Sequence, residues 1–407
     1  MKYFFCISVI VLALLFLRVR MYLQYRAIRK MLDNQYALCR QASCLSVFET
    51  DFFDLIALAV CRAPYTVRRK LLKRFAIGDI KALFLYLKQN EPPLYFALNV
   101  LLKQKECFKK HTGSYSNLSK LALCLIYECQ GEYENLARIF STLPRFFLNI
   151  RLRHLQCMLY ARCLFLKTDL KKATGILKRL VKFLAKSDKA DKVAYAYFML
   201  GDNYRVAGSY DAAHVMYDKA WYIFCKTDER IGQGLVLVAL GLNYMSQKKI
   251  DEATEYLRAA SAIVNKTGNI FYKARILNMQ SLCLYLQNLP KQASYSAQKA
   301  FEMNKGINHI GGMAFSAELK AVSSYRQGDL KKAEMFAREA VKYFKQTRQE
   351  FFENEALYVL ACICSAGEQY RKANQIFERL QNRKKMHKAF FNIANIEELR
   401  YSADVKK

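Results

Sequence analysis

Small residues recur with a constant 40-residue period between about positions 154 and 381, in three separate registers. The first register comprises Ala173, Ala213, Ala253, Ala293, Ala333 and Ala373. The second lies seven positions further along, with Ala220, Ala260, Ala300 and Ala340 between Leu180 and Leu380. The third lies twelve positions before the first and comprises Ala161, Gly201, Gly241, Ser281, Ala321 and Ala361. Three small positions held over six units indicate a repeated structural unit.

Each unit is typical of a helical hairpin. A turn signal such as Gly208-Ser209 separates two apolar segments, and large residues such as Leu200 and Tyr217 lie between the small positions. A small residue on one helix lets its partner approach closely, and neighbouring hairpins bury the remaining apolar face by stacking. Only 5 prolines and 15 glycines occur in 407 residues, which favours long helices over strands.

The spacing of these residues resembles the tetratricopeptide repeat (TPR) family. The unit that carries the resemblance best contains Tyr197, Leu200, Gly201, Tyr204, Ala213, Tyr217 and Ala220. The chain differs from the family in a repeat of about 40 instead of about 34 residues, and it lacks the terminal proline. The resemblance implies an all-α fold, an α-solenoid in which helical hairpins form a right-handed superhelix.

The family's ligand groove is lined by the first helix of each hairpin. Carried over position by position, the resemblance implies a peptide groove formed by Tyr195, Phe198, Arg205, Arg275, Asn278, Tyr285, Phe315, Tyr325 and Arg326. Such an apolar and aromatic surface suits an extended or helical segment of a protein partner. The Lys/Asn set with which some members hold a C-terminal carboxylate does not occur, which argues against that mode of recognition.

Four regions follow from this reading. We expect a membrane anchor at 1–23, a degenerate helical region at 24–118, the TPR-like array at 119–385, and a C-terminal capping helix and tail at 386–407. A weaker unit is visible around Gln130–Tyr133, and a more degenerate one between Lys70 and Leu87.

The N-terminal anchor is predicted from an uncharged run, Tyr3–Leu17, which residues up to 23 extend. As a helix this run is about 22 Å long, slightly less than a bilayer core. A cleaved signal peptide is the alternative, but no small-residue cleavage site follows. Basic residues follow the run and few precede it, so the repeat domain is expected in the cytoplasm as part of a single-pass membrane protein. These basic residues are also candidates for anionic lipid contact.

The net charge is +31, with 65 Lys and Arg against 34 Asp and Glu. Such a balance is compatible with nucleic acid, lipid or an acidic protein. No single basic stripe emerges, so nucleic acid is possible but not favoured. The 13 cysteines are irregularly spaced within apolar helical segments, which favours small core residues in a reducing compartment over disulfides.

No motif indicates catalysis. The five histidines lack partners at ligand or triad spacing, and Gly306, Gly311 and Gly312 around His309 fit a loop between repeats better than a phosphate loop. We therefore expect no catalytic, cofactor or metal residue and no enzyme activity. The favoured function is a membrane-tethered scaffold for a protein or peptide partner of unknown identity. Two alternatives stay open: a basic repeat protein that binds RNA or ribosomes, and an envelope-assembly factor that faces the exterior.

Overall fold

The computed structural model describes most of the predicted array and parts of the preceding region. The described residues are 25–26, 49–63, 67, 70–71, 81–95, 116–130, 133–144, 152–166, 169–185, 190–307, 309–347 and 350–382. The predicted anchor and the predicted capping helix at 386–407 lie outside them. No helix among the described residues is both long and apolar enough to cross a membrane.

The chain divides into two compact units, Met1–Ile126 and Tyr127–Lys407. The first contains α2 (Glu49–Arg62), α4 (Lys81–Asn90) and most of α6 (Asn117–Gln130). Tyr86 on α4 donates a hydrogen bond to the backbone oxygen of Ala59 on α2, at 3.4 Å. The carboxylate of Glu91, after α4, accepts a hydrogen bond from Ser116 at 2.7 Å. These polar contacts join the three helices of the first unit.

The second unit is a series of antiparallel helical hairpins. Its helices are α7 (Tyr133–Ser141), α8 (Arg153–Leu166), α9 (Leu170–Leu184), α10 (Ala190–Val206), α11 (Tyr210–Lys226), α12 (Arg230–Ser246), α13 (Ile250–Asn265), α14 (Ile270–Leu286), α15 (Pro290–Gly306), α16 (Ile310–Arg326), α17 (Leu330–Gln346), α18 (Glu350–Ala366) and α19 (Tyr370–Asn382). From α10 onward, each helix begins one full period before the equivalent helix of the next hairpin, as Ala190, Arg230 and Ile270 do. The predicted 40-residue repeat is confirmed.

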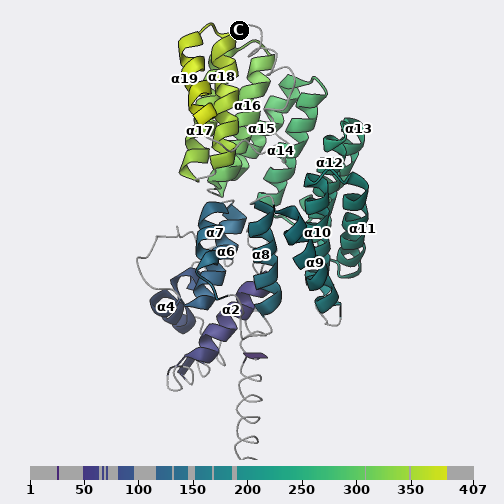
Figure 1. Ribbon diagram of the computed structural model, residues 1–407, viewed down its shortest axis with the longest axis vertical. Helices are drawn as coiled ribbons and strands as arrows, with labels where there is room; N and C mark the ends of the chain where they lie inside the picture. The colour runs from purple at the N-terminus through teal and green to yellow at the C-terminus, as the bar shows by residue number, and fades with distance from the viewer. Residues whose placement is uncertain are drawn as a thin grey trace, which may run out of the picture. The chain divides into compact units, whose positions relative to one another are not determined.

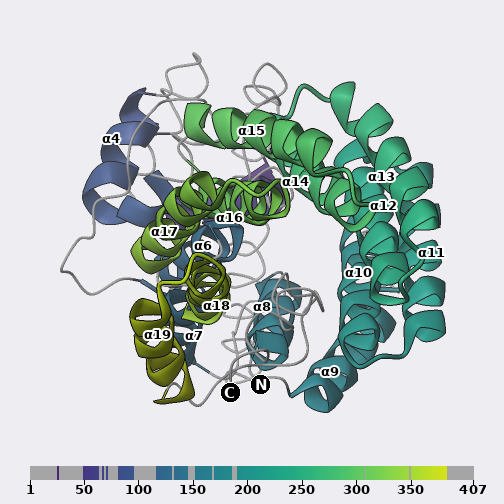
Figure 2. The same ribbon diagram turned by 90° about the horizontal axis from the view of Figure 1, so that it is seen from above.

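Within this unit the helices form two layers (Figures 1 and 2). The even-numbered helices from α10 to α18 lie on the inner side, and the odd-numbered helices from α11 to α19 lie on the outer side. Each outer helix packs against the inner helix of its own hairpin, and α11, α13, α15 and α17 also pack against the inner helix of the next hairpin. The outer helices cover one side of the inner row, so the other side of that row is the candidate binding surface.

The small residues of the three registers lie where helices meet. Ala213 and Ala220, the first-register and second-register residues of one outer helix, are 0% exposed, as are their equivalents in the next three hairpins. Gly201, on α10, is so close to Tyr217 that an added Cβ would lie 2.4 Å from the ring. The prediction that small residues permit close helix contact is confirmed.

The turns within the hairpins also repeat. The residue two positions after each inner helix has a positive φ: Gly208, Lys248, Asn288, Gly328 and Glu368. The following N–H bonds back across the turn, for example from Ser209 to the oxygen of Tyr204 at 2.8 Å. This is the Schellman pattern, which satisfies the last carbonyls of a helix through a left-handed residue.

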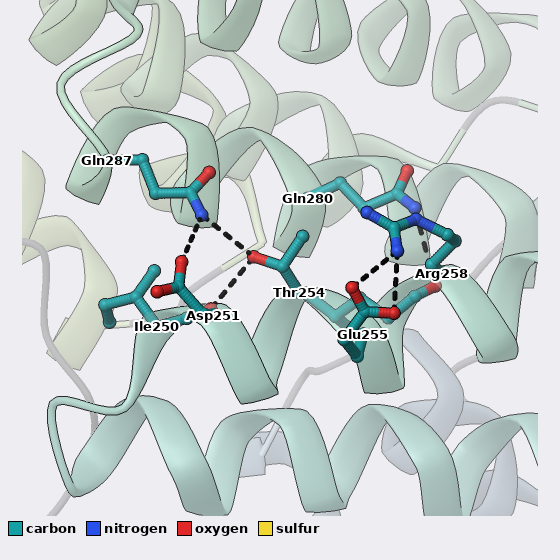
Figure 3. A network of polar contacts seen from close by, with 8 residues as sticks. Ile250, Asp251, Thr254, Glu255, Arg258, Gln280 and Gln287 are labelled. Atoms are coloured by element: carbon teal, nitrogen blue, oxygen red, sulfur yellow. Dashed lines mark hydrogen bonds and ion pairs between the residues drawn. The ribbon is translucent and has the colours of Figure 1, made fainter.

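A polar seam joins one hairpin to the next between α13 and α14 (Figure 3). Gln287, which caps α14, donates to the carboxylate of Asp251 at 3.1 Å and lies 3.4 Å from the hydroxyl of Thr254. Further along the same pair, Gln280 donates to the backbone oxygen of Leu257 at 3.4 Å. These hydrogen bonds fix where α14 lies along the axis of α13. Apolar packing alone specifies that position less sharply.

No disulfide joins any two of the eight cysteines in the described part of the chain, and six of the eight are buried. Burial raises the pKa of the Cys283 thiol to about 11, and its sulfur lies 3.5 Å from that of Met245. A thiol with so high a pKa stays protonated at neutral pH and packs as a small apolar group. The prediction that cysteines occupy core positions is confirmed for the six buried cysteines, whereas Cys225 is exposed.

Replacement of Gly201 by Ala tests the close contact at the third register. The new methyl group would collide with the ring of Tyr217, which is fully buried and hydrogen-bonded, so we expect a loss of about 1–3 kcal/mol in unfolding free energy. The matched control is Gly241→Ala, whose Cβ would lie 3.2 Å from Leu257 and 3.3 Å from the backbone oxygen of Ala253. Ala321 and Ala361 occupy the same register, so the fold accepts alanine there. Urea unfolding followed by circular dichroism measures both. Equal stability of the two variants would contradict the explanation.

Candidate functional site

The direction in which α16 presents its side chains identifies the inner face. Lys320 lies over the ring of Phe336 on α17, at 3.9 Å, and over that of Phe301 on α15, at 4.9 Å, so it points toward the outer layer. Glu318 precedes it by two positions and therefore lies about 200° around the helix, on the opposite side. The same position is occupied by Asn278 on α14, one repeat before Glu318, and by Phe198 on α10, three repeats before it.

At α10 the inner face begins with an aromatic pair. The rings of Tyr195 and Phe198 are stacked with centroids 5.7 Å apart, and Phe198 also contacts the buried ring of Tyr217 at 6.2 Å. Tyr195 is half-buried, while Phe198 is 9% exposed. Both are predicted groove residues. Tyr195 presents an accessible surface, and Phe198 packs between its ring and that of Tyr217.

Arg205, another predicted groove residue, lies near the end of α10 beside Asp202. A guanidinium nitrogen of Arg205 lies 3.9 Å from the Asp202 carboxylate, which also accepts a hydrogen bond from the Tyr217 hydroxyl at 2.8 Å. Burial, together with the charge of Asp202, raises the pKa of Tyr217 well above its ordinary value. The buried Nε of Arg205 has no hydrogen-bond partner among the described residues. A partner with an acceptor group would satisfy it.

Two other predicted groove residues hold neighbouring hairpins together. The guanidinium of Arg326 lies 4.0 Å from the ring centroid of Tyr285 and donates to the Tyr285 backbone oxygen at 2.6 Å. Tyr285 is 1% exposed and Arg326 is half-buried. Tyr285 is therefore a packing residue in this structure. Arg326 supplies a positive charge at the C-terminal end of α14, where the helix dipole favours it.

Asn278, on α14, is also a buried contact between hairpins. Its side-chain oxygen accepts a hydrogen bond from the Ser316 hydroxyl on α16, at 2.8 Å. The remaining predicted residues are accessible: Arg275 is exposed, whereas Phe315 and Tyr325 are half-buried. The structure thus places these nine residues on or just beneath the inner helices, and their role in binding stays a prediction.

The inner face also holds a buried acidic pair outside the predicted groove set. Glu318 on α16 is 0% exposed, and its two carboxylate oxygens have no hydrogen-bond partner among the described residues. Glu355 on α18 is 2% exposed. Burial, then the charge of Glu355, raises the pKa of Glu318 well above its ordinary value. The register reveals both positions, because Glu318 lies one repeat after Asn278 and Glu355 lies one repeat after Phe315.

His309 has a structural role. Its Nδ1 accepts a hydrogen bond from the backbone N–H of Gly312 at 3.0 Å, which makes it the N-cap of α16. Burial and the positive charge of Arg275 lower the pKa of His309 to about 4. Gly306 is the last residue of α15, and Gly312 lies in the first turn of α16, so these glycines flank the connection between the repeats and do not form it. Among the described residues no group of three or more His, Cys, Asp and Glu side chains could hold a metal ion.

Acidification tests the capping role of His309. The folded state disfavours the charged imidazole, so its contribution to stability is complete above the ordinary pKa of 6.5 and decreases as the pH falls toward about 4. We expect wild type to lose on the order of 2 kcal/mol across this window relative to His309→Asn. Asn suits the position because Asn269 caps α14 in the same register, at 3.2 Å from the N–H of Tyr272. Thermal melts of both proteins at several pH values measure the difference. Parallel pH profiles would contradict the role.

No family model and no curated protein matches the chain. Among solved structures, a Rap protein complexed with Competence and Sporulation Factor is similar over 78% of this chain and 97% of its own, with 12% identity and a TM-score of 0.52. A STAND protein with a tetratricopeptide repeat sensor from Pyrococcus horikoshii has 16% identity and a TM-score of 0.48, over 82% of this chain and 49% of its own. The Rap conjugation gene regulator of plasmid pLS20, in complex with the Phr* peptide, has 11% identity and a TM-score of 0.48, over 88% and 97%. The likeness to the first of these, together with the 40-residue register, shows that the chain is an all-α solenoid built of TPR-like helical repeats.

Proposed function

We propose that this chain is a binding scaffold that holds a segment of a partner protein along the inner face of its repeats. The observation that carries the proposal is one inner register, positions 195, 235, 275, 315 and 355, which reads Tyr, Leu, Arg, Phe and Glu. The packing registers keep small residues in hairpin after hairpin, whereas this register changes its chemistry in every one. Packing between hairpins does not require this register to vary. Recognition of one partner does require it, because the surface must differ from hairpin to hairpin while the repeat stays the same.

The accessible members of this register define the kind of segment that fits. Tyr195, stacked on Phe198, and the half-buried Phe315 offer aromatic surfaces for apolar side chains. Arg275 lies between them in the register and is exposed, so its guanidinium can receive a carboxylate. We infer a segment with apolar anchors and an acidic group, bound without chemical change. The Rap protein of the same fold was also solved as a complex, with Competence and Sporulation Factor.

The same proposal includes a membrane tether on the cytoplasmic side. It is supported by the uncharged run Tyr3–Leu17 and by the basic residues Arg18, Arg20 and Arg26 that follow it. Basic residues on one flank favour the cytoplasm for that flank. In this arrangement the repeats present the partner segment at the membrane surface.

Site-specific photo-crosslinking tests the inner face. A photoreactive phenylalanine analogue replaces Tyr195 or Tyr325 in the full-length protein, and Tyr222 on outer helix α11, 58% exposed, serves as the control. We expect the two inner positions to crosslink the same protein in cells and the outer position not to. Arg275→Glu, added to the Tyr195 probe, should reduce that crosslink strongly, because it places a carboxylate opposite the acidic group of the partner. A shared product at Tyr222, or an unchanged yield with Arg275→Glu, would place the partner elsewhere.

Cell fractionation tests the tether separately. We expect the full-length protein, tagged at its C-terminus, to remain in the membrane pellet after alkaline extraction and to retain residues 3–23. Protease added to sealed inverted vesicles should digest the repeats, since they are expected on the cytoplasmic side. A soluble protein whose N-terminus has been removed would rule out the anchor while leaving the inner-face proposal intact.

A further inference from the structure

A second surface, between outer helices α17 and α19, also has the features of a binding site. A hollow of about 620 Å³ lies there, floored by α18. Its apolar lining consists of Val341, Leu357, Leu360 and Ile376, and its other lining residues are Arg338, Lys342, Lys345, Gln346 and Arg379. Four of these nine residues are basic and none is acidic. The volume falls within the usual range for a ligand pocket.

The preceding interval, between α15 and α17, shows why the hollow exists. There the equivalent residues, one repeat earlier, are Phe301, Lys320 and Phe336, and the lysine fills the space between the two rings. Between α17 and α19 their places are taken by Val341, Leu360 and Ile376. The smaller apolar residues leave the space open. A hollow of about 390 Å³ does occur in the earlier interval, but its lining includes Lys320 and is mainly polar.

The charge of the rim is reversed between the same two intervals. The charges of Glu302 and Glu339 act on Lys320 in the earlier interval, while Lys342 and Arg379 occupy the equivalent positions in the later one. Arg338 is paired with Glu334 at 2.6 Å, and Arg379 lies 3.9 Å from Glu353. Lys342 and Lys345 are both exposed, and among the described residues neither forms an ion pair with a carboxylate. Two cations are thus available for an acidic ligand.

The arrangement of these cations favours a peptide over a small amphiphile. Arg338, Lys342 and Lys345 are four and three positions apart on α17, so they form a row about 10 Å long on one helix face. A single acidic headgroup would be held by charges gathered at one point. A row beside an apolar hollow matches a chain with several carboxylates and one bulky apolar side chain.

We propose that this groove docks an acidic segment of a partner protein, which inserts a bulky apolar side chain between α17 and α19. Carboxylates of the segment pair with Lys342 and Lys345 of the row on α17, and the side chain contacts Leu357 and Leu360. The groove lies on the outer layer and does not depend on the inner-face proposal.

The test uses the full-length protein and a fluorescein-labelled synthetic helical peptide that carries Glu residues three and four positions apart around one Phe. Binding is followed by fluorescence anisotropy. Lys342→Glu restores the acidic residue of the earlier interval, and Leu360→Lys restores its lysine, so each should weaken binding about tenfold or more, equivalent to about 1.4 kcal/mol. Lys305→Glu, one repeat before Lys345, is the matched control and should leave the affinity unchanged.

Several results would overturn the proposal. They are the absence of saturable binding, equal affinity for a peptide in which Lys replaces Glu, and equal affinity of wild type and both groove variants. Lys342 is exposed, so its variant remains informative if Leu360→Lys lowers stability. Phosphatidylserine vesicles form a separate arm, measured by co-sedimentation. If the groove variants lose vesicle binding and keep peptide binding, the groove is a lipid site and the proposal fails.

Discussion

Close approach of helices at small residues is the constraint on which the second unit depends. Ala213 and Ala220 lie on one face of α11, seven positions apart, and both are fully buried. A longer side chain at either position would separate the helices, and because the same register repeats, similar changes would alter the spacing of every hairpin. The left-handed turn residues and the polar seam at Gln287 act on helices already brought together by this contact. They refine the position of each helix along its neighbour.

This constraint also explains how much of the fold could be predicted from sequence. The spacing of small residues specifies the hairpins, and the inner and outer helices begin at the predicted intervals. The roles of single groove residues were harder to predict, since register gives the side of a helix and not the depth of a side chain. Tyr285 occupies an inner position, yet Arg326 from the next inner helix lies over its ring. Such burial depends on two residues 41 positions apart and on the helices that carry them.

The inner helices carry two buried polar groups that packing alone does not explain. Glu318 is buried without a hydrogen-bond partner among the described residues, and a buried polar group left unsatisfied costs roughly 1–3 kcal/mol. Apolar residues occur at the same register in two other hairpins, as Phe198 and Val238, so the fold does not require a carboxyl there. A polar group that packing does not require is a candidate for recognition. Arg205 is a second such group, with a basic side chain, because its buried Nε also lacks a hydrogen-bond partner among the described residues.

In a repeat array, equivalent positions of neighbouring hairpins can be compared directly. Between α15 and α17, Lys320 occupies the space beside Phe336, and the charge of Glu302 acts on Lys320. One repeat later, Leu360 and Lys342 replace them and the space is open and positive. The helices begin at the same repeat positions in both places, and the side chains at these positions differ. Packing between hairpins does not require an open apolar hollow beside exposed cations. A ligand that supplies apolar volume and negative charge accounts for both changes together.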